Sequence, residues 1–93
     1  SLSRELGPFG VRVNAVQPGP VAGPRIERVI HAKAESTGRT PDQVRDAMTA
    51  QSSLGRFVTN QDIADTILFL SSPQARNISG QAVSVCADST DLI

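Results

Sequence analysis

Residues 12–19 read Arg-Val-Asn-Ala-Val-Gln-Pro-Gly, and this stretch decides the fold. Together with Val11 just before it, the first part of this stretch has β-branched residues that alternate with others, which is typical of a β-strand. Pro18 and Gly19 close the stretch, because proline has no N–H for a strand ladder and a Pro-Gly pair favours a turn. We therefore predict a strand over residues 11–17. A further glycine and two prolines before residue 25 predict an irregular, stiff loop after it.

Helical patterns flank this strand on both sides. Upstream, residues 1–7 read as the last turns of a helix with Gly7 as its stop, so we expect the chain to begin inside that helix. Downstream, residues 24–53 predict two helices, the first beginning with Pro24 and the second with the capping-box pattern Thr40-Pro41-Asp42-Gln43. A helix over residues 60–72 has so wide an apolar surface that we expect it to be mostly buried. A short interior strand is predicted over residues 81–86.

The order of these elements indicates an α/β fold. Strands that are separated by helices form parallel crossovers within one sheet. Parallel sheets need both faces covered and more than two strands, so this pair does not make a stable sheet by itself. We therefore expect residues 1–93 to be one part of a single domain whose other strands lie outside this chain.

Composition and charge exclude several classes of protein. Nine Lys plus Arg balance nine Asp plus Glu, so neither nucleic acid nor an anionic membrane surface is an expected partner. A helix-turn-helix DNA binder built from residues 40–72 is disfavoured, because that stretch is net acidic. The single cysteine, Cys86, cannot form an internal disulfide, which fits a cytoplasmic protein. One His and one Cys do not predict a metal site.

Four stretches, in order, resemble the short-chain dehydrogenase/reductase family. Residues 1–11 resemble the end of the helix that carries the family's Tyr-x-x-x-Lys pair, and residues 12–19 resemble the strand and turn before the nicotinamide site. Residues 62–72 and 77–85 resemble the family's penultimate helix and last strand. The resemblance implies the C-terminal part of a Rossmann-like, doubly wound parallel sheet. It also implies an oxidoreductase that transfers hydride between NAD or NADP and a small-molecule alcohol or ketone, working as a homo-oligomer (dimer or tetramer).

The resemblance assigns the cofactor contacts to the turn after the first strand. It implies that the main chain of Val21 holds the carboxamide of the cofactor. Pro18 and Gly19 agree with this physically, because glycine lets a flat ring approach the backbone and proline fixes the turn; the alternative is that this pair simply ends a strand. Gly23 stands where many family members have a Thr whose hydroxyl touches the cofactor, so only a backbone contact is expected there.

The resemblance also places the family's substrate lid over residues 24–53. An apolar wall with a basic residue is expected on its first helix, made by Arg25, Ile26, Val29 and Ile30, with Met48 from the second helix. Either Arg25 or Arg28 would face an acidic group on the substrate. The alternative is an ordinary amphipathic helix pair with solvated arginines. His31 lies four residues after Glu27 and is interpreted as half of a surface pair.

The remaining chemistry is expected to lie outside the chain. No glycine-rich phosphate loop stands between a strand and a helix here, so the pyrophosphate of a dinucleotide needs another site. The resemblance places the catalytic Ser, Tyr and Lys before residue 1, and Cys86 is interpreted as a buried structural residue. We therefore expect residues 1–93 alone to be inactive. The alternative is a non-catalytic truncated paralogue, or an oligomerisation module that docks on a full-length subunit.

Overall fold

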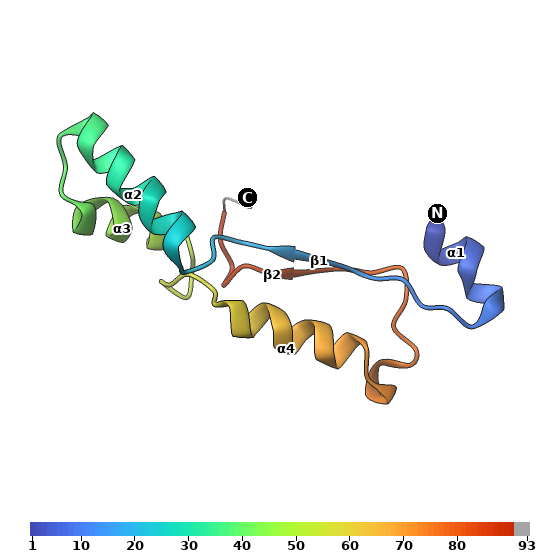
Figure 1. Ribbon diagram of the computed structural model, residues 1–93. Helices are drawn as coiled ribbons and strands as arrows, with labels where there is room; N and C mark the ends of the chain where they lie inside the picture. The colour runs from blue at the N-terminus through green and yellow to red at the C-terminus, as the bar shows by residue number, and fades with distance from the viewer. Residues whose placement is uncertain (91–93) are drawn as a thin grey trace.

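The computed structural model describes residues 1–90 of the chain. Its elements follow one another as helix, strand, three helices and strand, with a short 3-10 turn after the first helix and another before the last strand (Figure 1). They are α1 (Leu2–Leu6), η1 (Gly7–Phe9), β1 (Ala15–Pro18), α2 (Pro24–Thr37), α3 (Pro41–Thr49), α4 (Asn60–Leu70), η2 (Pro73–Ala75) and β2 (Ala82–Val85).

The two strands form a parallel pair. Ala15 lies opposite Ala82, and Pro18 lies opposite Val85. Helices α2, α3 and α4 make up the crossover between the strands, and α4 packs against both of them (Figure 1). The α/β fold class that the sequence predicts is confirmed.

The strand predicted over residues 11–17 is wrong at its start, because β1 begins only at Ala15. Before Ala15, the side chain of Asn14 makes hydrogen bonds to the backbone of the segment that leads into the last strand. Its Nδ2 donates to the Ile78 carbonyl at 3.0 Å, and its Oδ1 accepts from the Gln81 N–H at 3.1 Å. An Asn side chain that bonds backbone groups competes in this way with regular pairing.

The last strand is also shorter than the predicted range of 81–86, because β2 spans Ala82–Val85. Beyond it, Ala87 and Asp88 have left-handed φ values of 52° and 57°. The chain therefore bends, and the Ala87 carbonyl accepts hydrogen bonds from the Ser52 hydroxyl and the Leu54 N–H. These bonds direct the end of β2 to the segment that follows α3.

Helix ends differ from the prediction at three places. Gly7 is right-handed and does not stop the chain, which continues through η1 to Gly10, where a φ of 76° ends the turn. Helix α4 ends at Leu70 and not at residue 72, because Pro73 disfavours a helical conformation of the residue before it. Residues 50–53, predicted as part of the lid helices, form turns after α3.

The capping box predicted for α3 is present, and α4 begins with a second one. The Thr40 Oγ1 accepts from the Gln43 N–H at 3.1 Å, and the Gln43 Oε1 accepts from the Thr40 N–H at 2.9 Å. Thr59 and Asp62 make the same pair of bonds at the start of α4, at 3.1 and 2.8 Å. Each box satisfies two backbone N–H groups that a helix start would otherwise leave free.

Helices α2 and α3 form a helical hairpin with a core of its own. The buried residues of that core are Ile26, Ile30, Ala34 and Val44, with Met48 and Phe57 packed against them. Among the described elements, α2 and α3 pack only on each other. The helical hairpin therefore projects from the sheet and forms one end of an elongated molecule of 56 × 23 × 22 Å (Figure 1).

Two isolated backbone bridges join the two ends of the helical hairpin to each other and to the chain that follows β2. Val21 pairs with Val58 in a parallel bridge, and Ser52 pairs with Ser89 in an antiparallel one. Ser52 is buried, and its hydroxyl donates to the Ala87 carbonyl. The bridges therefore determine where α2 stands relative to the end of β1.

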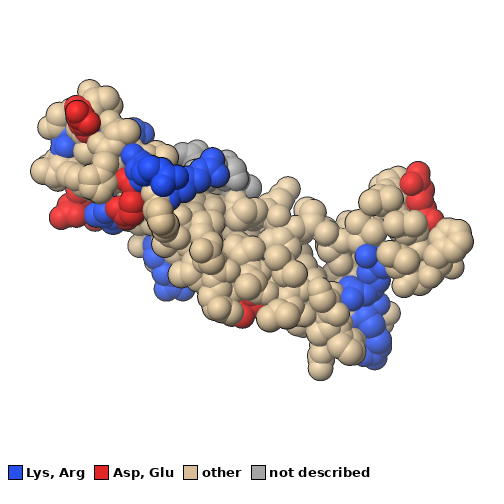
Figure 2. All heavy atoms as spheres, in the orientation of Figure 1, with Lys and Arg blue, Asp and Glu red and all other residues tan. Residues whose placement is uncertain are grey.

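The outer face of α4 is exposed, contrary to the prediction that this helix is mostly buried. Ile67, Leu68 and Phe69 are 49%, 66% and 50% exposed, and only Leu70 is buried in α4. Figure 2 shows charged side chains gathered at the two ends of the molecule, with a largely uncharged face between them. The prediction fails because no described element covers this side of α4. Within residues 1–90, no helix has the length and apolar character that crossing a membrane requires.

Candidate functional site

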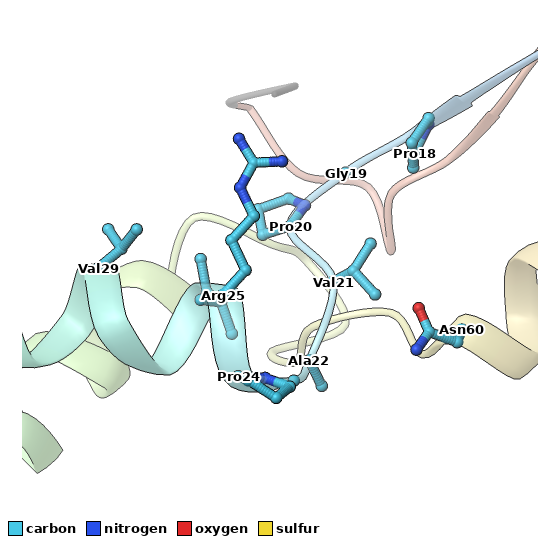
Figure 3. Close-up of a pocket in the computed structure, with 11 residues that line it drawn as sticks. Pro18, Gly19, Pro20, Val21, Ala22, Pro24, Arg25, Val29 and Asn60 are labelled. Carbon is cyan, nitrogen blue, oxygen red and sulfur yellow. The ribbon is translucent and has the colours of Figure 1, made fainter.

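The turn between β1 and α2 forms a pocket of about 350 Å³ at the carboxyl end of β1 (Figure 3). The lining residues are Pro18, Gly19, Pro20, Val21, Ala22, Gly23, Pro24, Arg25, Ile26, Val29 and Asn60. In open α/β sheets, ligands bind outside the carboxyl ends of the strands. The pocket therefore lies where such a sheet binds small molecules.

Val21 presents unpaired backbone groups at this pocket. The Val58 N–H donates to the Pro20 carbonyl at 3.1 Å, and the Ala22 N–H donates to the Val58 carbonyl at 2.8 Å. Backbone groups alternate in direction along an extended chain, so the N–H and C=O of Val21 itself point away from Val58. Neither group has a hydrogen-bond partner in the part of the chain that the structure describes. One donor beside one acceptor is the complement of a carboxamide.

Gly19 is buried against the chain that leaves β2. A Cβ placed on it would stand 2.8 Å from both the Cα and the Cβ of Cys86. Its N–H donates to the Val85 carbonyl at 2.9 Å. The structure thus gives a packing reason for this glycine, in addition to the approach of a flat ring that the sequence suggests.

Gly23 is open on its side-chain face. Its φ is 147°, and a Cβ at this position would meet nothing within 4 Å. It precedes α2 as the N-cap and offers no side-chain hydrogen bond to the helix. The residue can therefore contact a ligand only through its backbone, as the sequence predicts.

The first two turns of α2 form one wall of the pocket. Arg25, Ile26 and Val29 line it, and Val29 is 46% exposed while Ile26 is 6% exposed. The prediction is wrong for Ile30, which is fully buried between α2 and α3 and does not reach the pocket. Ile30 lies one helical turn beyond Ile26 on the stripe that faces α3, so it is farther from the turn that forms the pocket and is covered by α3.

Two other lid residues also lie away from the pocket. Met48 packs on the core of the helical hairpin, and Arg28 is an exposed residue of α2 outside the lining. His31 bonds the backbone carbonyl of Glu27, with its Nδ1 at 2.8 Å from that oxygen. The expected pairing of His31 with the Glu27 carboxylate is therefore wrong, because both carboxylate oxygens bond Arg45.

Four lining residues were missed by the sequence analysis, namely Pro20, Ala22, Pro24 and Asn60. The first three are neighbours of predicted residues on the same turn, so their presence follows from the length of the turn. Asn60 begins α4 and reaches the pocket only because Val58 pairs with Val21. A contact between residues so far apart has no local sequence signal.

Cys86 is half-buried, not fully buried as predicted. It lines a separate hollow of about 410 Å³ beside the start of α4, together with Arg56, Asp62 and Asp65. In this hollow, hydrogen bonds from the backbone and side chain of Thr59 lower the pKa of Asp62. On the helical hairpin, the hydrogen bond to Glu27 raises the pKa of Arg45, whose side chain also pairs with Asp42.

Comparison with known proteins gives consistent matches over nearly the whole chain. A family model described as Enoyl-(Acyl carrier protein) reductase matches residues 1–87. The short-chain reductase protein NovJ of Streptomyces niveus is 38% identical over 85 residues, which cover 91% of this chain and 31% of NovJ. The 3-oxoacyl-[acyl-carrier-protein] reductase FabG of Staphylococcus aureus is 35% identical over 85 residues, which cover 91% of this chain and 30% of FabG. The chain thus spans about a third of the length of these curated relatives.

Solved structures agree with the fold. The F189W actinorhodin polyketide ketoreductase with NADPH superposes with a TM-score of 0.81 at 31% identity, covering 92% of this chain and 33% of that one. A 3-oxoacyl-[acyl-carrier protein] reductase from Brucella melitensis with bound NAD superposes with a TM-score of 0.69 at 28% identity, covering 95% and 27%. The match over residues 1–87 and the shared parallel β-α-β arrangement place this chain in the short-chain dehydrogenase/reductase family.

Proposed function

We propose that residues 1–93 are the C-terminal third of an NAD(P)-dependent oxidoreductase that transfers hydride between nicotinamide and an alcohol or ketone. In this proposal the segment holds the nicotinamide end of the cofactor and covers the substrate. The complete protein works in the cytoplasm as a homo-oligomer.

The observation that carries the proposal is that, within the described residues, the backbone N–H and C=O of Val21 are unpaired at the carboxyl end of a parallel strand. A carboxamide has one acceptor and two donor hydrogens, so it can bond the C=O and N–H of one residue together. Both groups of Val21 lack partners within residues 1–90, although the other polar group of each of the two peptide units, the Pro20 C=O and the Ala22 N–H, is bonded to Val58. The residues of the turn therefore fit the nicotinamide end of the cofactor.

Each wall of the pocket has a distinct role in this proposal. The open face of Gly23 leaves room beside the backbone. Ile26 and Val29 provide an apolar surface against the substrate and exclude water, which strengthens the polar contacts within the site. When bound, the cofactor supplies the hydride.

Proton transfer to or from the reacting oxygen needs a group that this chain does not provide. The resemblance of this chain to the family implies that a tyrosine has that role, and the 93 residues contain no Tyr. We therefore assign the acid–base residues to the part of the protein outside this chain, and we expect the chain alone to be inactive.

For the substrate we propose a 3-oxoacyl thioester. The support comes from similar proteins, which include 3-oxoacyl-[acyl-carrier-protein] reductases and a polyketide ketoreductase. The apolar wall made by Ile26 and Val29 suits the acyl part of such a substrate.

A pair of variants of the complete protein tests the role of Val21. Val21→Pro removes the N–H that the fold leaves free, whereas Val21→Ala keeps it and shortens only the side chain. We expect Val21→Pro to weaken NADPH or NADH binding about 3- to 10-fold, since one hydrogen bond contributes about 0.5–1.5 kcal/mol, and Val21→Ala to bind nearly as the parent does. Binding is measured by titration of cofactor fluorescence, with thermal melting as the check that each variant is folded. Equal affinity in a folded Val21→Pro protein would remove Val21 from the cofactor site.

A further inference from the structure

Arg25 is the single charged residue of the lining of the pocket. It is exposed, and Figure 3 shows its side chain extending from α2 alongside Pro20. Within residues 1–90 it has neither an ion pair nor a hydrogen bond from its guanidinium. The pocket therefore carries a positive charge that nothing in the described chain neutralises.

Other arginines of the chain differ from Arg25 in this respect. Arg45 holds two carboxylates, with Glu27 at 2.5 Å and Asp42 at 2.8 Å. Arg12 donates to the Ile78 carbonyl at 3.1 Å. Arg28 is exposed on the same helix as Arg25 but does not line the pocket. Among the arginines, Arg25 alone combines a place on the pocket wall with a guanidinium that has no partner in the described part of the chain.

The acid nearest to Arg25 along the helix is already engaged. Glu27 gives both of its carboxylate oxygens to Arg45, so it is held on the side of α2 that faces α3. Within residues 1–90, no Asp or Glu belongs to the lining of the pocket. An anionic group that enters the pocket would therefore meet a cation without a competing carboxylate on the wall.

We propose that Arg25 binds a phosphate group of the ligand that occupies this pocket. A guanidinium presents paired N–H donors that match two phosphate oxygens, and such charge-assisted bonds are stronger than neutral ones. The inference rests on the proposed function and sharpens it. Two ligands of the proposed enzyme contain such a phosphate group. They are the dinucleotide, through its pyrophosphate, and a phosphopantetheine-linked thioester, through the phosphate of its carrier arm.

The test compares Arg25→Met with Arg28→Met in the complete protein. Both changes remove one guanidinium from α2 and keep a long side chain, but only the first alters the pocket lining. Four ligands are used: inorganic pyrophosphate and NADPH in binding titrations, and a 3-oxoacyl-CoA and the matching phosphate-free N-acetylcysteamine thioester in steady-state kinetics. We expect Arg25→Met to weaken at least one phosphate-bearing ligand about 10-fold or more, and Arg28→Met to change each by less than about 2-fold.

The pattern of losses identifies the source of the phosphate. Weaker binding of pyrophosphate and NADPH, with unchanged KM for both thioesters, assigns Arg25 to the dinucleotide. A raised KM for the CoA thioester alone assigns it to the phosphates of the carrier arm of the thioester. Unchanged values for all four ligands, or an equal loss for the phosphate-free thioester, would overturn the proposal.

Failure of the proposed function gives a different result. In that case the parent protein itself would neither bind NADPH nor reduce a thioester. The pyrophosphate titration would still report on Arg25, because it needs no turnover, and equal pyrophosphate binding by the parent and Arg25→Met would then refute the phosphate site.

Discussion

At the scale of single residues, Gly19 joins the fold to the site. Its missing side chain lets the end of β1 touch Cys86, and the same residue lines the pocket. The sequence predicts that a glycine belongs at this turn. It does not reveal that Gly19 contacts Cys86, because Gly19 follows β1 and Cys86 follows β2, far away along the chain. The resemblance to the family assigns Pro18, Gly19, Val21 and Gly23 to the cofactor site, and in the structure all four line one pocket because they belong to the same short turn.

Gly19→Ala tests the packing reason. We expect the variant of the complete protein to lose about 1–3 kcal/mol of unfolding free energy, because a Cβ at 2.8 Å from Cys86 forces the two segments apart. Gly7→Ala is the matched control, since Gly7 is right-handed and a Cβ there meets nothing within 4 Å. Chemical denaturation measures both, and equal stability of the parent and Gly19→Ala would show that the contact is not tight in solution.

The proposed cofactor role of Gly19 needs this control as well. A larger side chain at Gly19 would lower cofactor affinity either by blocking the ring or by displacing Cys86. Substitution at Val21 separates these effects, because the N–H of Val21 takes no part in the described fold. The variants of Val21 are therefore the sharper test of the site.

At the scale of elements, local signals were predictive and distant ones were not. Helices α3 and α4 begin where their capping patterns place them, since each box involves residues only three apart. The start of β1 was misplaced because it depends on bonds from Asn14 to Ile78 and Gln81, more than sixty residues away. Val29 lines the pocket whereas Ile30 is buried against α3. This difference depends on which side of α2 faces α3, and that is determined by the packing of the two helices.

The cap of α4 predicts a dependence on acid. Hydrogen bonds from Thr59 lower the pKa of Asp62 in the folded protein, so the ionised carboxylate is the form that the fold favours. The contribution of Asp62 to stability is therefore fully present above the ordinary range of Asp, about pH 4, and is lost as the pH falls through its folded value.

Asp62→Asn keeps an acceptor oxygen for the Thr59 N–H but cannot be protonated in this range. We expect the variant to be somewhat less stable than the parent near pH 7, with the difference shrinking in acid below about pH 4. Urea denaturation of both proteins at several pH values measures this. A difference that stays constant as the pH falls would show that the carboxylate is not coupled to folding.

At the scale of the whole molecule, the described chain has separate packed regions and no common core. The helical hairpin buries its residues against itself, while α4 covers the two strands on one side and leaves Ile67, Leu68 and Phe69 exposed on the other. The order of elements was enough to predict the α/β class. The exposure of α4 could not be predicted from its apolar pattern, because burial depends on which neighbours are present.

This arrangement predicts that the 93 residues are loosely packed when produced alone. Two parallel strands with an exposed apolar helix bury too little surface to offset the conformational entropy of the chain. We expect binding of a hydrophobic dye and a broad thermal transition. Dispersed amide signals together with a sharp cooperative melt of the monomer would contradict this.

The last prediction concerns where the chemistry resides. An oxidoreductase of this kind has two requirements that must be met in the same complex. The nicotinamide cofactor must be held by its phosphates, and the reacting oxygen of the substrate must gain or lose a proton. The chain offers a pocket at the end of β1 and a free arginine, but it contains no tyrosine. We expect the complete protein to carry a Tyr-x-x-x-Lys pair before residue 1, because a nearby ammonium lowers the pKa of a tyrosine toward neutrality. We also expect a glycine-rich turn between a strand and a helix nearer its N-terminus, where the pyrophosphate can be bound.

The isolated chain should then show no oxidation of NADPH with a 3-oxoacyl thioester. The complete protein should oxidise NADPH with this substrate and should lose the activity when the tyrosine is changed to phenylalanine. Turnover by the 93 residues alone would place the acid–base group within this chain, and a complete protein without the Tyr and Lys pair would favour a docking module over an enzyme.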